Sequence, residues 1–201
     1  MAQIQIIPAF TDFPQEALHV GAILSGYSVL EFWLLQCLTS AIGDPFTAVK
    51  VLYRTRGEEQ RIIIADALMR DRYALTSLAN PYCEAIADLQ WCRKIRNQYA
   101  HCYWDLSATK RDFLTFVNLE EVAKKHGTLD VQDKDVERVD LALLKAQTTY
   151  FVYVRGCLMH LHYGYNALAG RSPIRDSPLL KKLPRPPLSN GPASPAHPQT
   201  G

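Results

Sequence analysis

The chain has 201 residues, of which 48% are hydrophobic and 21% are charged, a composition typical of a soluble globular domain with its own core. Its net charge of +2 is uneven: residues 171–201 hold five basic residues against one acidic residue, so the remaining body carries about −2. A mildly acidic body excludes a broad platform for duplex DNA, which needs many phosphate contacts.

Residues 1–10 are expected to form a short extended arm. Thr11 or Asp12 is suited to cap a helix that continues to about Ile42, where Gly43 ends it. This long apolar segment holds Glu31 near its centre, which is costly in lipid, and lacks the basic flank of a signal peptide. It is therefore predicted to be the central helix of a soluble bundle, with no membrane contact.

Three further helices are predicted from apolar residues at helical spacing. Asp44-Pro45 starts the first of them, which ends near Tyr53, and Gly57 separates it from the next. That helix extends from Glu58 to about Ala79, and Asn80-Pro81 ends it and opens another. The predicted ranges after the first helix are 45–53, 58–79 and 81–101.

The stretch between residue 104 and the last helix is predicted to be a small irregular or hairpin insert. Residues 104–107 are expected to form an exit loop, residues 112–118 alternate as a strand does, and residues 122–133 are polar and irregular. A long final helix is predicted over residues 134–168 from its apolar spacing. The fold class is therefore all-α, an up-and-down bundle of four to five helices with this insert before the last helix.

The composition changes at residue 171. Eight of the twelve prolines fall within residues 171–201, together with serine, glycine and basic residues. This composition is typical of disordered chain. We therefore divide the sequence into a helical bundle domain, residues 1–170, and a Pro-rich basic disordered tail, residues 171–201.

Five cysteines are present, an odd number with no Cys-x-x-Cys spacing, so neither a disulfide framework nor a metal site is predicted. Each lies in an apolar run, which favours buried free thiols in a reducing compartment and hence a cytoplasmic location. The five are Cys37, Cys83, Cys92, Cys102 and Cys157.

The most informative segment is residues 96–101, which read Arg-Asn-Gln-Tyr-Ala-His near the end of the fourth predicted helix. Histidine exchanges protons near neutral pH, and arginine holds phosphate oxygens with a rigid fork of donors. Asn97 and His101 lie four residues apart, on one helical face, and the long side chain of Arg96 can reach over that face. Together they predict a site for a phosphodiester.

The chemistry that these side chains allow is RNA cleavage without a metal or other cofactor. His101 would act as general base toward a ribose 2′-hydroxyl, and Arg96 would stabilise the extra negative charge on phosphorus. Asn97 would orient His101 or a phosphate oxygen. A second histidine must protonate the leaving oxygen, and a symmetric dimer is a natural source for it.

Arg96-Asn97 followed by His101 resembles the signature of the HEPN superfamily, in which an arginine, then usually Asn, Asp or His, and a histidine lie at a helix end. The resemblance extends over about residues 12–168 by helix pattern alone. It implies a four- or five-helix bundle, a homodimer with both motifs in one cleft, and frequently a metal-independent endoribonuclease acting on RNA. Such domains recur as toxins and in antiphage or RNA-processing systems, so an antitoxin or nucleotidyltransferase is an implied partner.

Three residues outside this triad are assigned supporting roles. Glu31 is a candidate partner for Arg96, because a carboxylate in an apolar helix needs a hydrogen-bonding partner. Tyr99 and Trp104, like Tyr103, are aromatic side chains of the core or a dimer interface, or surfaces on which RNA bases stack.

Two alternatives to catalysis stay open. The same residues would bind a nucleotide or partner protein in a non-catalytic dimeric bundle, or the chain would be a structural helical protein. Catalysis requires His101 to be exposed, whereas a structural role predicts a capped and buried His101.

Overall fold

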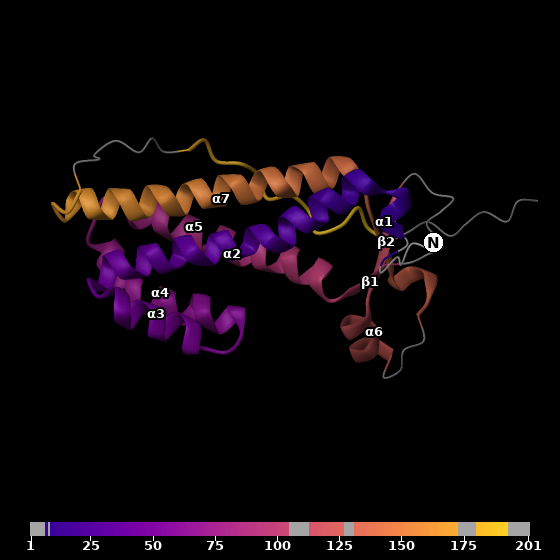
Figure 1. Cartoon of the computed structure of the whole chain (residues 1–201), viewed down its shortest axis with the longest axis horizontal. Coiled ribbons are helices and arrows are strands. Elements are labelled where there is room, and N and C mark those ends of the chain that lie inside the picture. The colour runs from indigo at the N-terminus through magenta and orange to yellow at the C-terminus, as the bar shows by residue number, and fades with distance from the viewer. Residues whose placement is uncertain (1–6, 8, 105–112, 127–130, 173–179, 193–201) are drawn as a thin grey trace, which may run out of the picture. The chain divides into compact units, whose positions relative to one another are not determined.

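A computed structural model describes residues 7, 9–104, 113–126, 131–172 and 180–192. Within these ranges 73% of the residues are helical, and a small three-stranded sheet is the other regular element. The prediction of an all-α helical bundle with a small insert is confirmed. The elements are α1 (Ala9–Asp12), α2 (Pro14–Ile42), α3 (Pro45–Arg54), α4 (Glu58–Ala74), α5 (Ala79–Ala100), β1 (Cys102–Trp104), β2 (Leu114–Asn118), α6 (Leu119–His126), β3 (Val136–Val139) and α7 (Leu141–Leu168) (Figure 1).

The chain divides into two compact units. The first unit comprises residues 1–24, 95–148 and 186–201, and the second comprises residues 25–94 and 149–185. The candidate triad of residues 96, 97 and 101 therefore belongs to the first unit.

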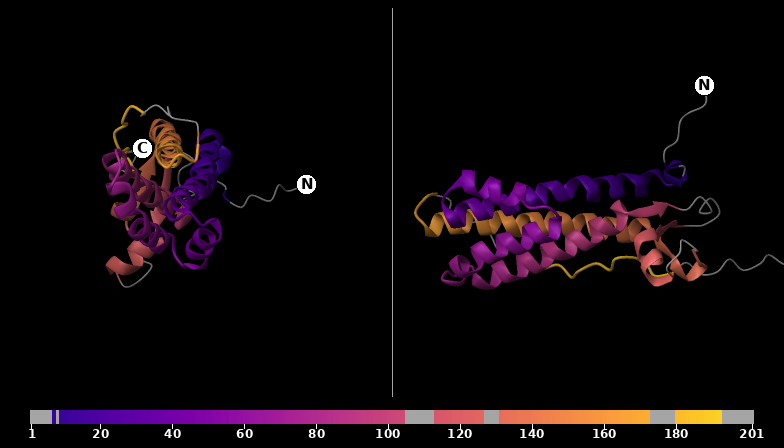
Figure 2. Two further views of the ribbon diagram at one scale, coloured as in Figure 1. Left: turned by 90° about the vertical axis from the view of Figure 1, so that its left-hand side faces the viewer. Right: turned by 90° about the horizontal axis from the view of Figure 1, so that it is seen from below.

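In the second unit, α3 and α4 pack against each other (Figure 2). The side chain of Asp44 accepts the Phe46 N–H at 3.0 Å and caps α3, as the sequence predicts. Gly57, at φ +81°, makes the turn before α4, a backbone conformation that residues with a Cβ rarely adopt.

Buried polar contacts join the other helices of the second unit. The Cys37 thiol on α2 donates to the Leu158 carbonyl on α7 at 3.3 Å. The Tyr73 ring on α4 stacks on the Tyr82 ring on α5, with centroids 4.5 Å apart. The Tyr82 hydroxyl donates to Asp66 Oδ1 at 2.6 Å. This hydrogen bond satisfies the hydroxyl although the Tyr82 side chain is buried.

The first unit contains the sheet, whose strands are ordered β1-β2-β3 and pair antiparallel. Tyr103 lies opposite Val117 in the first pair, and Phe116 lies opposite Glu137 in the second. The strand predicted over residues 112–118 is present as β2. An exit loop is predicted over residues 104–107, but Trp104 is the last residue of β1. The rest of that range lies outside the described residues.

The final helix begins later than predicted, at Leu141 rather than residue 134. Asp140 explains this start, because its Oδ1 accepts the Leu143 N–H at 2.7 Å and so caps the helix. Val136 and Val139 precede the cap and belong to β3, where β-branched side chains fit the pleated surface.

Other boundaries differ because side chains near helix ends compete for backbone groups. Residues 122–133, predicted to be irregular, include most of α6, which begins where the Asn118 side chain accepts the Glu121 N–H at 3.2 Å. α4 ends at Ala74 instead of residue 79, because the Thr76 hydroxyl donates to the Tyr73 carbonyl at 2.7 Å. Residues 9–12 form a helical turn in place of the predicted arm, whose residues 1–6 lie outside the described part.

Residues 180–192, for which the composition predicts disorder, follow a defined path instead. Arg185 contacts the buried Asp88 of the second unit at 2.8 Å. We call residues 186–192, which lie in the first unit, the strap. Buried glutamines donate hydrogen bonds to backbone carbonyls of the strap. Prolines favour an extended backbone whose carbonyls remain available as acceptors, and composition alone does not reveal that partners for them exist.

The cysteines are less uniformly buried than predicted. Cys37 and Cys92 are buried, Cys102 and Cys157 are half-buried, and Cys83 on α5 is exposed. Burial raises the pKa of Cys37 and of Cys102 to about 12, so both thiols are neutral at physiological pH. Among the described residues, no group of three or more His, Cys, Asp or Glu side chains is placed to hold a metal ion.

α2 is the one helix of the described chain that is long and apolar enough to cross a membrane. The core helix of a soluble protein passes the same test. Glu31 near its centre forms an ion pair with Arg61 on α4, which is how a helix inside a protein satisfies a half-buried carboxylate. A membrane protein is therefore not indicated.

Candidate functional site

The last turns of α5 expose one face of the candidate site and bury the other. Ile95 and Tyr99 are buried, whereas Arg96 and Asn97 are half-exposed and His101 is exposed just after the helix end. The apolar face holds the helix in place, so the polar face can present its side chains to solvent. The exposure of His101 is what catalysis requires and what a buried structural role would not give.

The three predicted residues are joined by two hydrogen bonds. Arg96 Nη1 donates to Asn97 Oδ1 at 3.0 Å, and the backbone N–H of His101 donates to the Asn97 carbonyl at 3.2 Å. The second bond continues the helical pattern by one residue, so Asn97 and His101 lie on the same face, as their spacing predicts. Asn97 therefore links the arginine to the backbone of the histidine.

An aromatic cluster lies next to this turn. Tyr99 stacks on Trp104 with ring centroids 5.8 Å apart, and both rings also contact Phe116 of β2. The Phe10 ring covers Trp104 from α1 at 5.0 Å. Because Tyr99 and Trp104 are buried, they support the site from within the core, while Tyr103, 53% exposed, is the aromatic residue on the surface.

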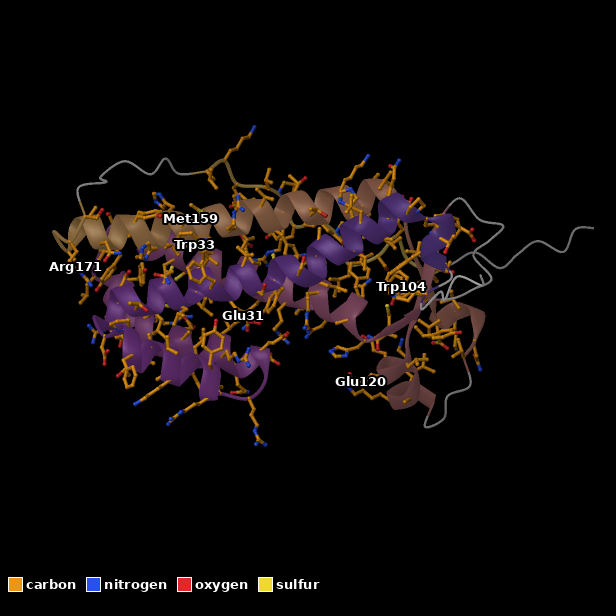
Figure 3. The ribbon with its side chains drawn as sticks, viewed as in Figure 1. Glu31, Trp33, Trp104, Glu120, Met159 and Arg171 are labelled. Carbon is orange, nitrogen blue, oxygen red and sulfur yellow. The ribbon has the colours of Figure 1, made fainter. Side chains whose placement is uncertain are left out.

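A charged pair on α6 lies within electrostatic range of His101. Lys124 donates a hydrogen bond to Glu120, which is labelled in Figure 3, and lowers the pKa of that carboxyl below its ordinary value, with a smaller electrostatic contribution from His101. Glu120 lies in the first turn of α6. This acidic residue close to the candidate base is one that the sequence analysis missed, because α6 was not predicted.

Glu31 does not have the partner proposed for it. Its Oε1 accepts from Arg61 Nη1 at 2.9 Å within the second unit, and Arg61 Nε also donates to the Thr55 carbonyl at 3.1 Å. The pairing of Glu31 with Arg96 is therefore corrected: Glu31 belongs to the α2–α4 contact (Figure 3). The carboxylate has an arginine partner, as predicted, but that arginine is Arg61 and not Arg96.

Two glutamines near the site were also missed. Gln98 and Gln147 are buried, and both donate to the carbonyl of Leu188 in the strap at 3.0 Å. A single glutamine among the other polar residues of a helix forms no motif, and Leu188 lies in a stretch of low-complexity composition. The sequence held no signal for this contact.

Comparison with known protein families, with curated proteins and with solved structures finds no match to this chain. The resemblance to the HEPN superfamily therefore rests on the residue 96–101 motif, together with its position at a helix end in a helical bundle.

Proposed function

We propose that the protein is a metal-independent endoribonuclease that acts as a homodimer in the cytoplasm. The observation that carries the proposal is the exposed His101 at the end of α5, beside Asn97 and the half-exposed Arg96. Histidine is a side chain suited to general acid–base chemistry, and a guanidinium recognises phosphate oxygens. The buried aromatic cluster fixes the turn that carries them.

In the proposed reaction, His101 removes the proton from a ribose 2′-hydroxyl, and the oxygen attacks the adjacent phosphorus. The bond from phosphorus to the 5′-oxygen breaks, and that oxygen takes a proton from an imidazolium. The products are a 2′,3′-cyclic phosphate and a 5′-hydroxyl. Arg96 stabilises the charge on the phosphoryl oxygens, and His101 of a second copy supplies the leaving-group proton.

The test is cleavage of a labelled structured RNA in EDTA by the wild type and by His101→Ala and Arg96→Ala. Arg155→Ala, which removes an exposed arginine of α7, is the matched control for loss of positive charge. We expect cyclic-phosphate ends from the wild type and the control. Loss of a general base or of a phosphate-binding arginine is expected to lower the rate by a factor of about 10² to 10⁴.

A folded, dimeric wild type that cleaves none of several RNAs would refute the nuclease proposal and favour the non-catalytic bundle. In that case the same surface would bind a nucleotide or a partner protein, such as an antitoxin or a nucleotidyltransferase. Equal cleavage by His101→Ala and the wild type would also refute it, since no other residue has been assigned the role of base.

A further inference from the structure

Gln147 occupies a central position in the first unit. It lies on α7, is 0% exposed, and uses both ends of its amide. Nε2 donates to the carbonyls of Pro187 at 2.8 Å and Leu188 at 3.0 Å, and Oε1 accepts from the Tyr99 hydroxyl at 2.7 Å. One buried side chain therefore joins the strap to the candidate motif.

The strap also contacts the motif directly. Gln98 Nε2 donates to the Leu188 carbonyl at 3.0 Å, and the Tyr99 hydroxyl lies 3.4 Å from the same oxygen. Gln98 and Tyr99 are consecutive residues between Asn97 and His101. The Leu188 carbonyl thus accepts hydrogen bonds from the buried side of the last turn of α5. The candidate triad lies on the exposed side of the same turn.

The other end of the strap is held by the sheet. The Asn190 N–H donates to the Arg138 carbonyl of β3 at 2.9 Å, and the Arg138 N–H donates to the Gly191 carbonyl at 3.2 Å. A bridge between Glu137 and Pro192 extends this antiparallel pairing. The strap therefore adds to the edge of β3, which gives it a fixed register relative to α5.

These contacts give the strap a role beyond covering a surface. If it were released, the amide of Gln147 would lose two acceptors and that of Gln98 would lose one, in a buried environment where polar groups are costly to leave unpaired. The helix turn of residues 98–101 would then have to rearrange or admit water. The position of Tyr99, and with it the adjacent triad, depends on whether the strap is bound.

We propose that Gln147 is a positioning residue and that binding of the strap sets the geometry of the Arg96–His101 site. The inference rests on the proposed nuclease function for its catalytic consequence only. The Leu188 carbonyl, Gln147 and Tyr99 transmit the state of the strap to the end of α5, so a change in strap occupancy regulates the site.

The test compares full-length Gln147→Met and Gln98→Met with the wild type. Both changes conserve side-chain volume. Gln98→Met removes a single hydrogen bond to the strap, so this milder variant tests the proposal if Gln147→Met does not fold. Thr115→Val is the matched control, because its buried hydroxyl in the same unit has no hydrogen-bond partner among the residues that the structure describes. All variants are followed by amide hydrogen exchange, by titration of the His101 imidazole in NMR spectra, and by RNA cleavage.

The Asn190 amide reports strap binding, and the His101 amide reports the end of α5. In Gln147→Met we expect exchange of both amides to accelerate by about tenfold or more, as the loss of several hydrogen bonds implies. The His101 titration should shift, a change that a purely structural loss elsewhere would not produce. Cleavage should lose about tenfold to a hundredfold in kcat with little change in KM.

Faster exchange at Asn190 with an unchanged His101 amide and titration would overturn the inference, because the strap would then be released without affecting the site. The same would follow if Thr115→Val behaved like Gln147→Met. If the wild type cleaves no RNA while the two amides and the titration change together, the nuclease proposal fails and the positioning role of Gln147 stands.

Discussion

Replacing Arg185 with alanine tests whether residues 180–185 are part of the folded second unit. Arg185 Nη2 lies 2.8 Å from Asp88 Oδ1, and Nε donates to the same oxygen at 2.8 Å. The side chain of Asp88 is 3% exposed and that of Arg185 is 46% exposed. Arg185→Ala therefore leaves a buried carboxylate without its cationic partner.

The expected loss follows from this burial. A hydrogen bond to a charged group contributes about 1.5–3 kcal/mol, and breaking a fully buried ion pair costs about 3–5 kcal/mol. Because water reaches the exposed half of the Arg185 site, we expect the free energy of unfolding to fall by about 2 kcal/mol. For a chain of this size the melting temperature should fall by about 4–8 °C.

Lys182→Ala is the matched control, because it removes a second cation of the same segment. Lys182 Nζ lies 3.0 Å from Glu84 Oε1, but both side chains are more than half exposed, so the loss should be below about 1 kcal/mol. Urea unfolding of both variants measures the difference. Equal losses in the two variants, or no loss in Arg185→Ala, would refute the argument that residues 180–185 are held within the second unit.

Three further outcomes follow from single contacts. A Cβ at Gly156 would lie 2.3 Å from Leu180 Cδ1, so Gly156→Ala should displace the Leu180 side chain and accelerate chymotrypsin cleavage at Leu180. Global stability should be preserved, because alanine gains about 1 kcal/mol of helix propensity over glycine. An unchanged rate of cleavage would contradict the contact. Burial holds the pKa of His162 below its ordinary value, so the unfolded chain takes up that proton first as pH falls. Stability should therefore decline below about pH 6.5, by at most about 1.4 kcal/mol per pH unit from this group, and His162→Gln should flatten the decline measured by urea unfolding at several pH values. Arg61→Met should cost about 1–2 kcal/mol in the same assay by leaving the half-buried Glu31 unpaired, and a neutral effect would show that this ion pair contributes nothing.

Local sequence signals predicted the helices well where the cause of the helix is itself local. The Asp44-Pro45 start of α3 and the glycines at 43 and 57 act through neighbouring backbone groups, so they can be read directly. α6 and β3 were missed, because the first is a short polar helix and the second depends on pairing with β2. Strand formation of this kind is decided by distant residues.

The candidate site shows the same division. The spacing of Asn97 and His101 fixed their common face, since four residues make one helical turn. The choice between Arg61 and Arg96 as the partner of Glu31 was not accessible to such reasoning, because it depends on which helix packs beside α2. Tyr99 and Trp104 could be recognised as aromatic support but not distinguished from a base-stacking surface until their burial was known.

Periodicity and side-chain type were enough to predict the helical class and the position of the motif at a helix end, and the chemistry of Arg96 and His101 stays a proposal that rests on their side-chain types. That residues 180–192 are part of the fold became evident from long-range contacts alone. Their partners, Asp88 and Gln147, come from segments about a hundred and about forty residues away along the chain, and each is one of several polar residues of its helix. Gln147 donates to backbone carbonyls, which every residue carries, and Asp88 pairs with one of many arginines, so neither contact leaves a local pattern in the sequence.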